Sequence, residues 1–238
     1  FDGKGRKEWD SKKLIELTRE LQPNIVVNDR LDLNDVEGGW DYRTPEQFMP
    51  REWVTVDGKQ VPWETCQTFS GSWGYHRDES SWKSVEQLVR MLVEVVSKGG
   101  NLLLNVGPTG RGEFDVRSLD RLAGMGEWML RHDRSIYGCT QVPAEFVGSP
   151  QCCLTYNPEK RRIYAHVFTW PFEQLHLDGF AGKVEYAQLL NDASEIFMTE
   201  SPTHHRASDV EDRQTLTLQL PVRQPDVTVP VIELFLKS

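Results

Sequence analysis

The sequence predicts an α/β domain followed by an antiparallel β domain. Over residues 1–142, helical patterns alternate with short apolar runs, which is typical of a parallel sheet covered by helices. Over residues 143–238, alternating and β-branched segments separated by turns replace the helical pattern. This second part is predicted to be an antiparallel β-sandwich.

Three helices are expected in the first domain. Residues 11–21 form an amphipathic pattern, with Ser11 as a candidate N-cap. A second, strongly apolar helix begins at Ser84 with a capping-box pattern and ends before a pair of glycines. The third helix covers about residues 116–131.

Three strands are expected between these helices. Residues 25–27 form a short continuous apolar run, as in a strand buried on both faces. Residues 65–69 are a second candidate, and residues 101–108 are predicted to form a buried strand that runs into a Gly/Pro loop. Polar residues follow the presumed strand ends at Asp2, Asn28–Arg30, Ser70–Tyr75 and Asn105. Catalytic groups of (β/α)8 barrels lie at such carboxyl ends, so these positions are candidate site residues.

The order of elements fits both an open doubly wound sheet and a (β/α)8 barrel. A nucleotide-binding sheet would need a glycine fingerprint between strand and helix. The GPTGRGE segment at 107–113 contains glycines but neither GKS/T nor GxGxxG, so it gives little support for phosphate binding. Residues 31–62 lack periodicity, and such long connections tend to be functional.

Composition excludes several classes of protein. The 238 residues are 38% hydrophobic, which suits a globular protein, and no apolar stretch is long enough for a membrane span. A net charge of -9 argues against nucleic acid as a partner. The four cysteines form no CxxC, and no histidines or cysteines have metal-ligand spacing, so no metal is expected.

Three carboxylates stand in suggestive settings: Asp2 before a glycine, Glu46 in RTPEQ and Glu64 after Pro62-Trp63. Glycoside hydrolysis needs two carboxyl groups across a sugar ring. An Asp-Gly pair is also a common turn, so the pattern alone leaves both interpretations open.

Aromatic residues are dense between positions 40 and 82, and sugars stack on aromatic faces. Protein cores use aromatics as well, although Trp73 falls in an expected loop. Arg30 is interpreted either as an ordinary salt-bridge residue or as a donor fork for hydroxyl or carboxylate groups.

Five segments together resemble the α-L-fucosidases of glycoside hydrolase family 29. They are FDG at 1–3, NDR at 28–30, RTPEQ at 43–47, PWETCQTFSGSWGY at 62–75 and SKGGNLLLNVGPTGRGEF at 97–114. The similarity extends over about residues 1–140, and the final VPVIELFLK also resembles that family's terminal strand.

The resemblance implies the C-terminal half of a (β/α)8-type barrel followed by a β-sandwich. It implies hydrolysis of terminal α-L-fucosyl residues by a retaining mechanism without cofactor, on a fucosylated oligosaccharide or glycoconjugate. Asp2 would be the nucleophile and Glu46 the acid/base, with Glu64 as second choice or as a residue that organises the pocket. Arg30 would contact the fucose, and Trp73 would pack on its C5 methyl group.

The resemblance also implies that three N-terminal barrel strands are absent, so the chain is expected to be part of a larger protein and inactive alone. A secreted, periplasmic or lysosomal location is expected, and the oligomeric state stays open. Two alternatives are a non-catalytic carbohydrate-binding protein and a related retaining glycosidase with galactose-like specificity. A structural or protein-interaction role is a third, with no feature beyond the acidic surface to favour it.

Overall fold

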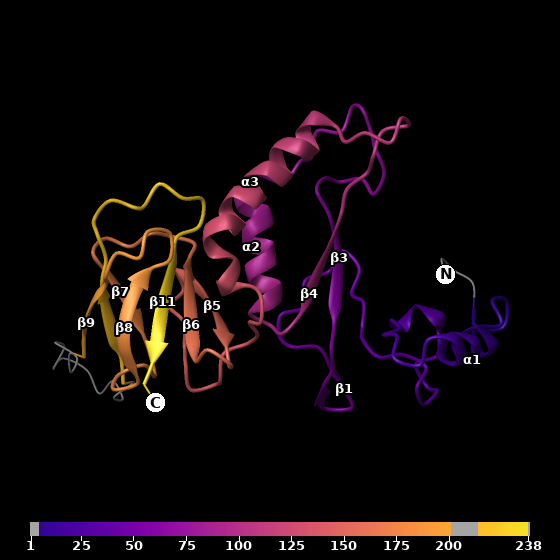
Figure 1. Ribbon diagram of the computed structural model, residues 1–238, viewed down its shortest axis with the longest axis horizontal. Coiled ribbons are helices and arrows are strands. Elements are labelled where there is room, and N and C mark those ends of the chain that lie inside the picture. The colour runs from indigo at the N-terminus through magenta and orange to yellow at the C-terminus, as the bar shows by residue number, and fades with distance from the viewer. Residues whose placement is uncertain (1–4, 201–213, 238) are drawn as a thin grey trace.

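The computed structural model describes residues 5–200 and 214–237, arranged from an N-terminal helical end to a C-terminal β-sandwich (Figure 1). The N-terminal part contains α1 (Ser11–Leu21), η1 (Asp29–Leu31), β1 (Thr55–Val56), β2 (Lys59–Gln60), β3 (Glu64–Thr68), α2 (Val85–Val96), β4 (Asn101–Asn105), α3 (Val116–His132) and η2 (Asp133–Ser135). None of the described helices is long and apolar enough to cross a membrane.

The three predicted helices are confirmed, with one corrected cap. The Ser84 hydroxyl accepts a hydrogen bond from the Gln87 backbone, and the Gln87 side chain returns one to Ser84, which completes the capping box. Ser11 is not the N-cap of α1, because the helix begins at Ser11 itself and Asp10 precedes it in a left-handed conformation. The predicted Ser11 cap was therefore wrong.

β3 and β4 form a parallel pair that two irregular segments extend. Glu64 pairs with Asn101 and Thr68 with Asn105 along the ladder. Isolated parallel bridges join Glu46 to Cys66, Arg43 to Trp63 and Asn28 to Tyr42. Four stretches of chain thus run parallel in sequence order, which confirms the α/β class of this part.

Residues 25–27 do not form the buried strand that the sequence predicts. Ile25 and Val26 are exposed, and so is Leu103 in β4. The leucines of α1, at positions 14, 17 and 21, are exposed as well. The apolar pattern was correctly recognised, but no described residues cover these side chains.

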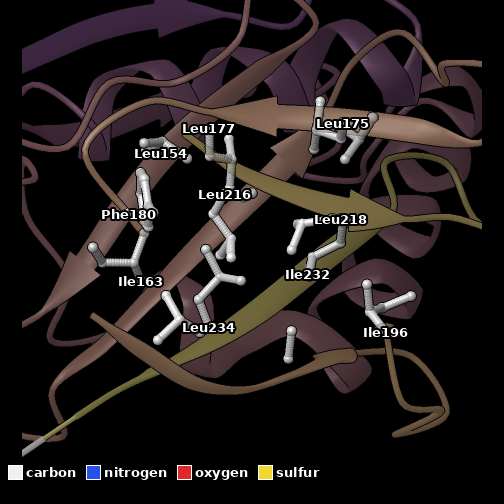
Figure 2. Close-up of a cluster of buried hydrophobic side chains, with 14 of the residues drawn as sticks. Leu154, Ile163, Leu175, Leu177, Phe180, Ile196, Leu216, Leu218, Ile232 and Leu234 are labelled. Carbon is white, nitrogen blue, oxygen red and sulfur yellow. The ribbon is translucent and has the colours of Figure 1, made fainter. Parts of the chain in front are cut away.

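The C-terminal part is a sandwich of two antiparallel sheets. Its strands are β5 (Cys152–Asn157), β6 (Arg162–Val167), β7 (Gln174–Leu177), β8 (Val184–Leu189), β9 (Phe197–Thr199), β10 (Leu216–Gln219) and β11 (Val231–Leu236). One sheet has the order β5-β6-β11-β8 and the other β7-β10-β9. Leucine and isoleucine side chains from both sheets meet between them, together with Phe180 from the connection between β7 and β8 (Figure 2).

The outer face of the four-stranded sheet packs on the helices. Val89 and Val93 of α2 and Trp128 of α3 share one buried cluster with Tyr164 and Val231 of the sheet. The helical layer and the sandwich are therefore joined by a common core. The boundary between residues 142 and 143 stays a prediction.

Two histidines are buried in the region where α3 meets the sheet. The His132 ring stacks on Trp128 with centroids 4.8 Å apart, and His166 of β6 has no exposed surface. Thr155 donates its hydroxyl proton to the Ser135 carbonyl, so His166 Nε2 must be the donor in its 3.0 Å bond to Thr155 Oγ1. Burial, with His132 nearby, lowers the pKa of His166 to about 3.

A neutral buried histidine makes folding sensitive to acid. In the unfolded chain the His166 imidazole has a pKa of about 6.5 and is protonated below that pH, whereas in the folded protein it stays neutral. As the pH falls from 6.5 toward 3, this residue should lower the free energy of unfolding by roughly 1 kcal/mol for each pH unit. Urea denaturation of the full-length protein and of His166→Gln across this range should show a shallower pH dependence in the variant. Equal slopes would contradict the prediction.

Two glycines of α3 offer a matched test of the packing between α2 and α3. A Cβ at Gly124 would lie 2.6 Å from Val85 Cγ2, whereas one at Gly126 would meet nothing within 4 Å. Gly124→Ala should destabilise the protein by about 1–3 kcal/mol through overpacking. Gly126→Ala should stabilise it by about 0.5–1 kcal/mol through helix propensity. Urea denaturation checks both. A stabilising effect of Gly124→Ala would contradict the prediction and show that α2 and α3 have room for a methyl group at this position.

Candidate active site

The candidate site residues lie on one face of the parallel strands. Partner residues in a parallel pair project to the same side, and successive residues alternate. The bridge between Glu46 and Cys66 therefore puts Glu46 on the same face as Cys66 and Glu64 of β3. Thr65, which belongs to the opposite face, is fully buried. The chemistry-bearing face is the one that the protein leaves accessible.

Glu46 and Glu64 stand at different heights along the strands. Glu64 is the first residue of β3, while Glu46 pairs with Cys66 two residues further on. With a rise of about 3.3 Å per residue, Glu46 lies about 7 Å closer to the carboxyl ends. Glu46 is thus nearer to the loops that follow the strands.

Glu46 forms an ion pair with Arg30. Arg30 Nη1 lies 2.5 Å from Glu46 Oε2, and both side chains are partly exposed. The other two guanidinium nitrogens bind Thr44: Nε donates to Oγ1 at 2.7 Å and Nη2 to the backbone carbonyl at 3.1 Å. The structure therefore brings together two of the predicted site residues, Arg30 and Glu46.

Glu64 has a different environment. It lines a cavity of about 300 Å³ together with Val26, Tyr42, Pro62 and Asn101. Burial raises the pKa of the Glu64 carboxyl. Burial also raises the pKa of Tyr42, and the nearby Glu64 charge adds to the effect. Glu64 thus sits in a partly desolvated recess toward the amino ends of the strands.

The neighbouring tryptophans have different tasks. Trp63 is fully buried, and its Nε1 donates to the Lys98 carbonyl at 3.0 Å. Trp82 lies beneath the guanidinium groups of Arg117 and Arg121, at 4.8 and 5.0 Å. Trp73 keeps 39% of its surface exposed. Of these three aromatic rings, Trp73 is the one free to meet a ligand.

The loop that carries Trp73 is tied to the strand ends. Asn105, the last residue of β4, donates its side-chain amide to the Trp73 carbonyl at 2.6 Å. Gly107 lies against Gly74, so closely that a Cβ there would collide with the Gly74 backbone. Backbone packing and one amide thus hold Trp73 near the carboxyl end of β4.

Glu79 fastens the far side of the same loop. Its carboxylate accepts from Ser72 Oγ at 2.6 Å, from Ser81 Oγ at 2.6 Å and from Ser81 N at 2.8 Å. These hydrogen bonds, with the Ser72 hydroxyl foremost, lower the pKa of Glu79 to about 2. Sequence analysis missed Glu79, because its role depends on loop closure rather than on a motif.

Asp2, the predicted nucleophile, lies outside the described residues. Within residues 5–200 and 214–237, no group of three or more histidine, cysteine or carboxylate side chains is placed to hold a metal ion. All four cysteines are free thiols. What the described site offers is therefore carboxylates, an arginine and an accessible indole.

Two carboxylates on one face of parallel strands are the kind of group that glycoside hydrolysis uses. The family model for alpha-L-fucosidase matches residues 1–134, more than half of the chain. The chain belongs to the α-L-fucosidase family, which confirms the resemblance drawn from the sequence.

Relatives within the family cover the chain only in part. Plasma alpha-L-fucosidase of Homo sapiens is 35% identical over an alignment 174 positions long, and the alignment covers 68% of this chain and 36% of that protein. Alpha-L-fucosidase of Dictyostelium discoideum is 30% identical over an alignment 170 positions long, which covers 68% of this chain and 35% of the relative. The chain spans about a third of the length of the curated relatives it matches.

Solved structures match over nearly the whole chain. Alpha-L-fucosidase isoenzyme 1 from Paenibacillus thiaminolyticus has 34% identity and a TM-score of 0.87, over 100% of this chain and 56% of that one. A Bacteroides thetaiotaomicron alpha-L-fucosidase, solved as a trapped covalent intermediate, has 26% identity and a TM-score of 0.78, over 97% and 53%. The fold is therefore shared with about half of each of these longer fucosidases.

The Glu79 contacts predict a pH-dependent loop. Because the folded pKa is lowered, the carboxylate stabilises the protein fully above about pH 4.5 and loses this effect as the pH falls toward 2. Glu79→Gln should therefore be less stable than the parent at pH 7 and equal to it near pH 2, as urea denaturation would show. Asp78→Asn, a change at the exposed neighbouring carboxyl, is the control and should stay within about 0.5 kcal/mol at pH 7. A deficit of Glu79→Gln that persists at pH 2 would contradict the assignment.

Proposed function

We propose that the full-length protein carrying this sequence hydrolyses terminal α-L-fucosyl residues of oligosaccharides or glycoconjugates with retention of configuration. The observation that supports this most is the Arg30–Glu46 pair near the carboxyl ends of the parallel strands, in a chain of the α-L-fucosidase family. Asp2 is the nucleophile, Glu46 the acid/base, and Arg30 and Trp73 contact the sugar. No cofactor takes part.

The reaction takes two displacements. An Asp2 carboxylate oxygen bonds to the anomeric carbon as the glycosidic C–O bond breaks, and Glu46 gives its proton to the departing oxygen. Water then attacks the same carbon, Glu46 takes the water's proton, and the ester bond to Asp2 breaks. Two inversions release α-L-fucose. The adjacent Arg30 guanidinium stabilises the negative charge that Glu46 carries between the steps.

Glu46 is preferred to Glu64 as the proton donor because it lies closer to the carboxyl ends of the parallel strands. The departing oxygen leaves toward the loops at the carboxyl ends, where barrel enzymes bind their substrates. Glu64, in its recess about 7 Å lower along the strands, suits a residue that organises the floor of the pocket. Its raised pKa fits a carboxyl placed in a partly desolvated cavity.

In the full-length protein, further strands outside these 238 residues complete the barrel. The four parallel stretches correspond to the C-terminal half of a (β/α)8-type barrel, and α1 and β4 expose leucines that neighbouring units would cover. The chain also spans only 36% of its human plasma relative. The 238-residue chain alone is therefore expected to be inactive, since Asp2 would lack the neighbours that position it.

Trp73 gives the site its preference for fucose over galactose. L-Fucose carries a methyl group at C5 where L-galactose carries a hydroxymethyl group, and an exposed indole offers an apolar wall for the methyl. The loop is anchored through the Trp73 carbonyl and Glu79, so the wall is held in place.

Hydrolysis of 4-nitrophenyl α-L-fucoside by the full-length protein tests the assignment. Asp2→Ala should lower kcat/KM by roughly 100-fold or more, because it removes the group that bonds to the anomeric carbon. Glu46→Ala should lower kcat by roughly 100-fold or more, because water in the second displacement loses its general base. Azide should restore Glu46→Ala and yield the α-fucosyl azide, since it replaces water in the second displacement. Glu52→Ala, at an exposed glutamate of the same long segment, is the matched control and should keep full activity.

Two outcomes would change the assignment. If Glu46→Ala keeps its activity while Glu64→Ala needs azide, the proton donor is Glu64. If the protein binds fucose but cleaves no fucoside, a carbohydrate-binding protein is the correct description.

A further inference from the structure

We propose that Thr44, held by Asp29, is a positioning residue that acts through Arg30 on Glu46. The inference rests on the proposed function and adds two residues to its machinery. Neither Thr44 nor Asp29 touches the substrate in this account. Their task is to fix the direction in which Arg30 presents its guanidinium to the carboxylate.

Asp29 fixes the Thr44 hydroxyl. Thr44 N donates to Asp29 Oδ1 at 3.1 Å, and Thr44 Oγ1 donates to the same oxygen. A hydroxyl has one proton to give, so the lone pairs of Thr44 Oγ1 are left for another donor. The Arg30 Nε–H fills that place at 2.7 Å. The proton direction along this chain of groups is therefore determined.

Thr44 in turn fixes the plane of Arg30. Nε binds the Thr44 hydroxyl and Nη2 binds the Thr44 carbonyl, on the same residue. Because the guanidinium is planar and rigid, these two bonds determine where Nη1 points. Nη1 lies 2.5 Å from Glu46 Oε2. The position of the carboxylate oxygen thus depends on a hydroxyl two residues earlier in the chain.

The start of this relay is itself held on two sides. Asp29 Oδ2 pairs with Arg43 Nη1 at 3.3 Å, and both of these side chains are about four-fifths buried, at 19% and 20% exposure. The Asn28 side chain accepts from Arg30 N at 3.1 Å and caps the short η1 turn. The NDR and RTPE segments are therefore locked together across neighbouring strands before any ligand arrives.

The consequence for catalysis concerns proton transfer. A general acid works only within hydrogen-bond reach of the departing oxygen. Loss of the Thr44 hydroxyl removes one hydrogen bond from Arg30 Nε and one from Asp29 Oδ1. The guanidinium can then rotate away from its present plane, and the Glu46 carboxylate can move with it. The resulting defect falls on substrates whose leaving group needs protonation, and spares those that depart as stable anions.

The test uses Thr44→Val and Thr44→Ser in the full-length protein with two fucosides. For methyl α-L-fucoside, whose leaving group needs the proton, Thr44→Val should lower kcat/KM by about 10- to 100-fold, as misplaced catalytic groups do. For 2,4-dinitrophenyl α-L-fucoside, kcat/KM should change by less than about 3-fold, because acid catalysis contributes little there. Thr44→Ser keeps the hydroxyl and should restore most of the first value.

Two controls separate positioning from a structural role. Thr65→Val removes a buried hydroxyl that donates to the Phe48 carbonyl on the opposite face of β3, and should affect both fucosides equally. In a Glu46→Ala background, Thr44→Val should add no further loss, because residues that act in series are not additive.

Equal losses on both fucosides for Thr44→Val, or full additivity with Glu46→Ala, would overturn the positioning role while the parent remains an active fucosidase. A parent that cleaves neither fucoside would instead refute the proposed function itself.

Discussion

The candidate site depends on four backbone hydrogen bonds that attach an irregular segment to β3. Arg43 N donates to the Pro62 carbonyl, Glu64 N to that of Arg43, Cys66 N to that of Pro45, and Gln47 N to that of Cys66, at 2.9–3.2 Å. Residues 43–47 have no helical or strand pattern of their own. These bonds put Glu46 beside Cys66, and the bridge between Asn28 and Tyr42 brings Thr44 within reach of Asp29.

The strand that receives this segment is held from its opposite face. Trp63 immediately precedes β3, is fully buried, and lies against Gly100 at the start of β4. A Cβ at Gly100 would overlap the indole, so only glycine allows the ring and the strand to approach so closely. The buried Trp63 indole packs on one face of the strand. The opposite face is therefore free to carry the carboxylates of Glu46 and Glu64.

Local patterns predicted the elements that are stabilised by their own sequence. α2 has a capping box and an apolar face, and β7 alternates between exposed and buried residues, as a strand with one face in solvent does. Residues 25–27 were predicted as a strand on apolarity alone, yet the structure shows a single bridge at Asn28. The difference is physical, because a strand needs a partner in the correct register, and register between distant segments is not encoded in either segment separately.

The same limit explains which site residues could be named in advance. Arg30, Glu46, Glu64 and Trp73 were found because motifs contain them. The coupling of Asp29, Thr44 and Arg30 joins residues 14 or 15 positions apart. This coupling can be recognised only in the structure, where the bridge between Asn28 and Tyr42 fixes the register of the two segments.

Once the bridges to Trp63 and Cys66 set the register of residues 43–46, the alternation of side chains places Thr44 on the same face as Glu46. Position along the strands favours Glu46 as the proton donor, whereas the Arg30 guanidinium favours the ionised form that accepts a proton in the second step. Glu64 has the recess and the raised pKa, but Glu46 has the arginine and the position, and for a proton donor geometry is the first requirement.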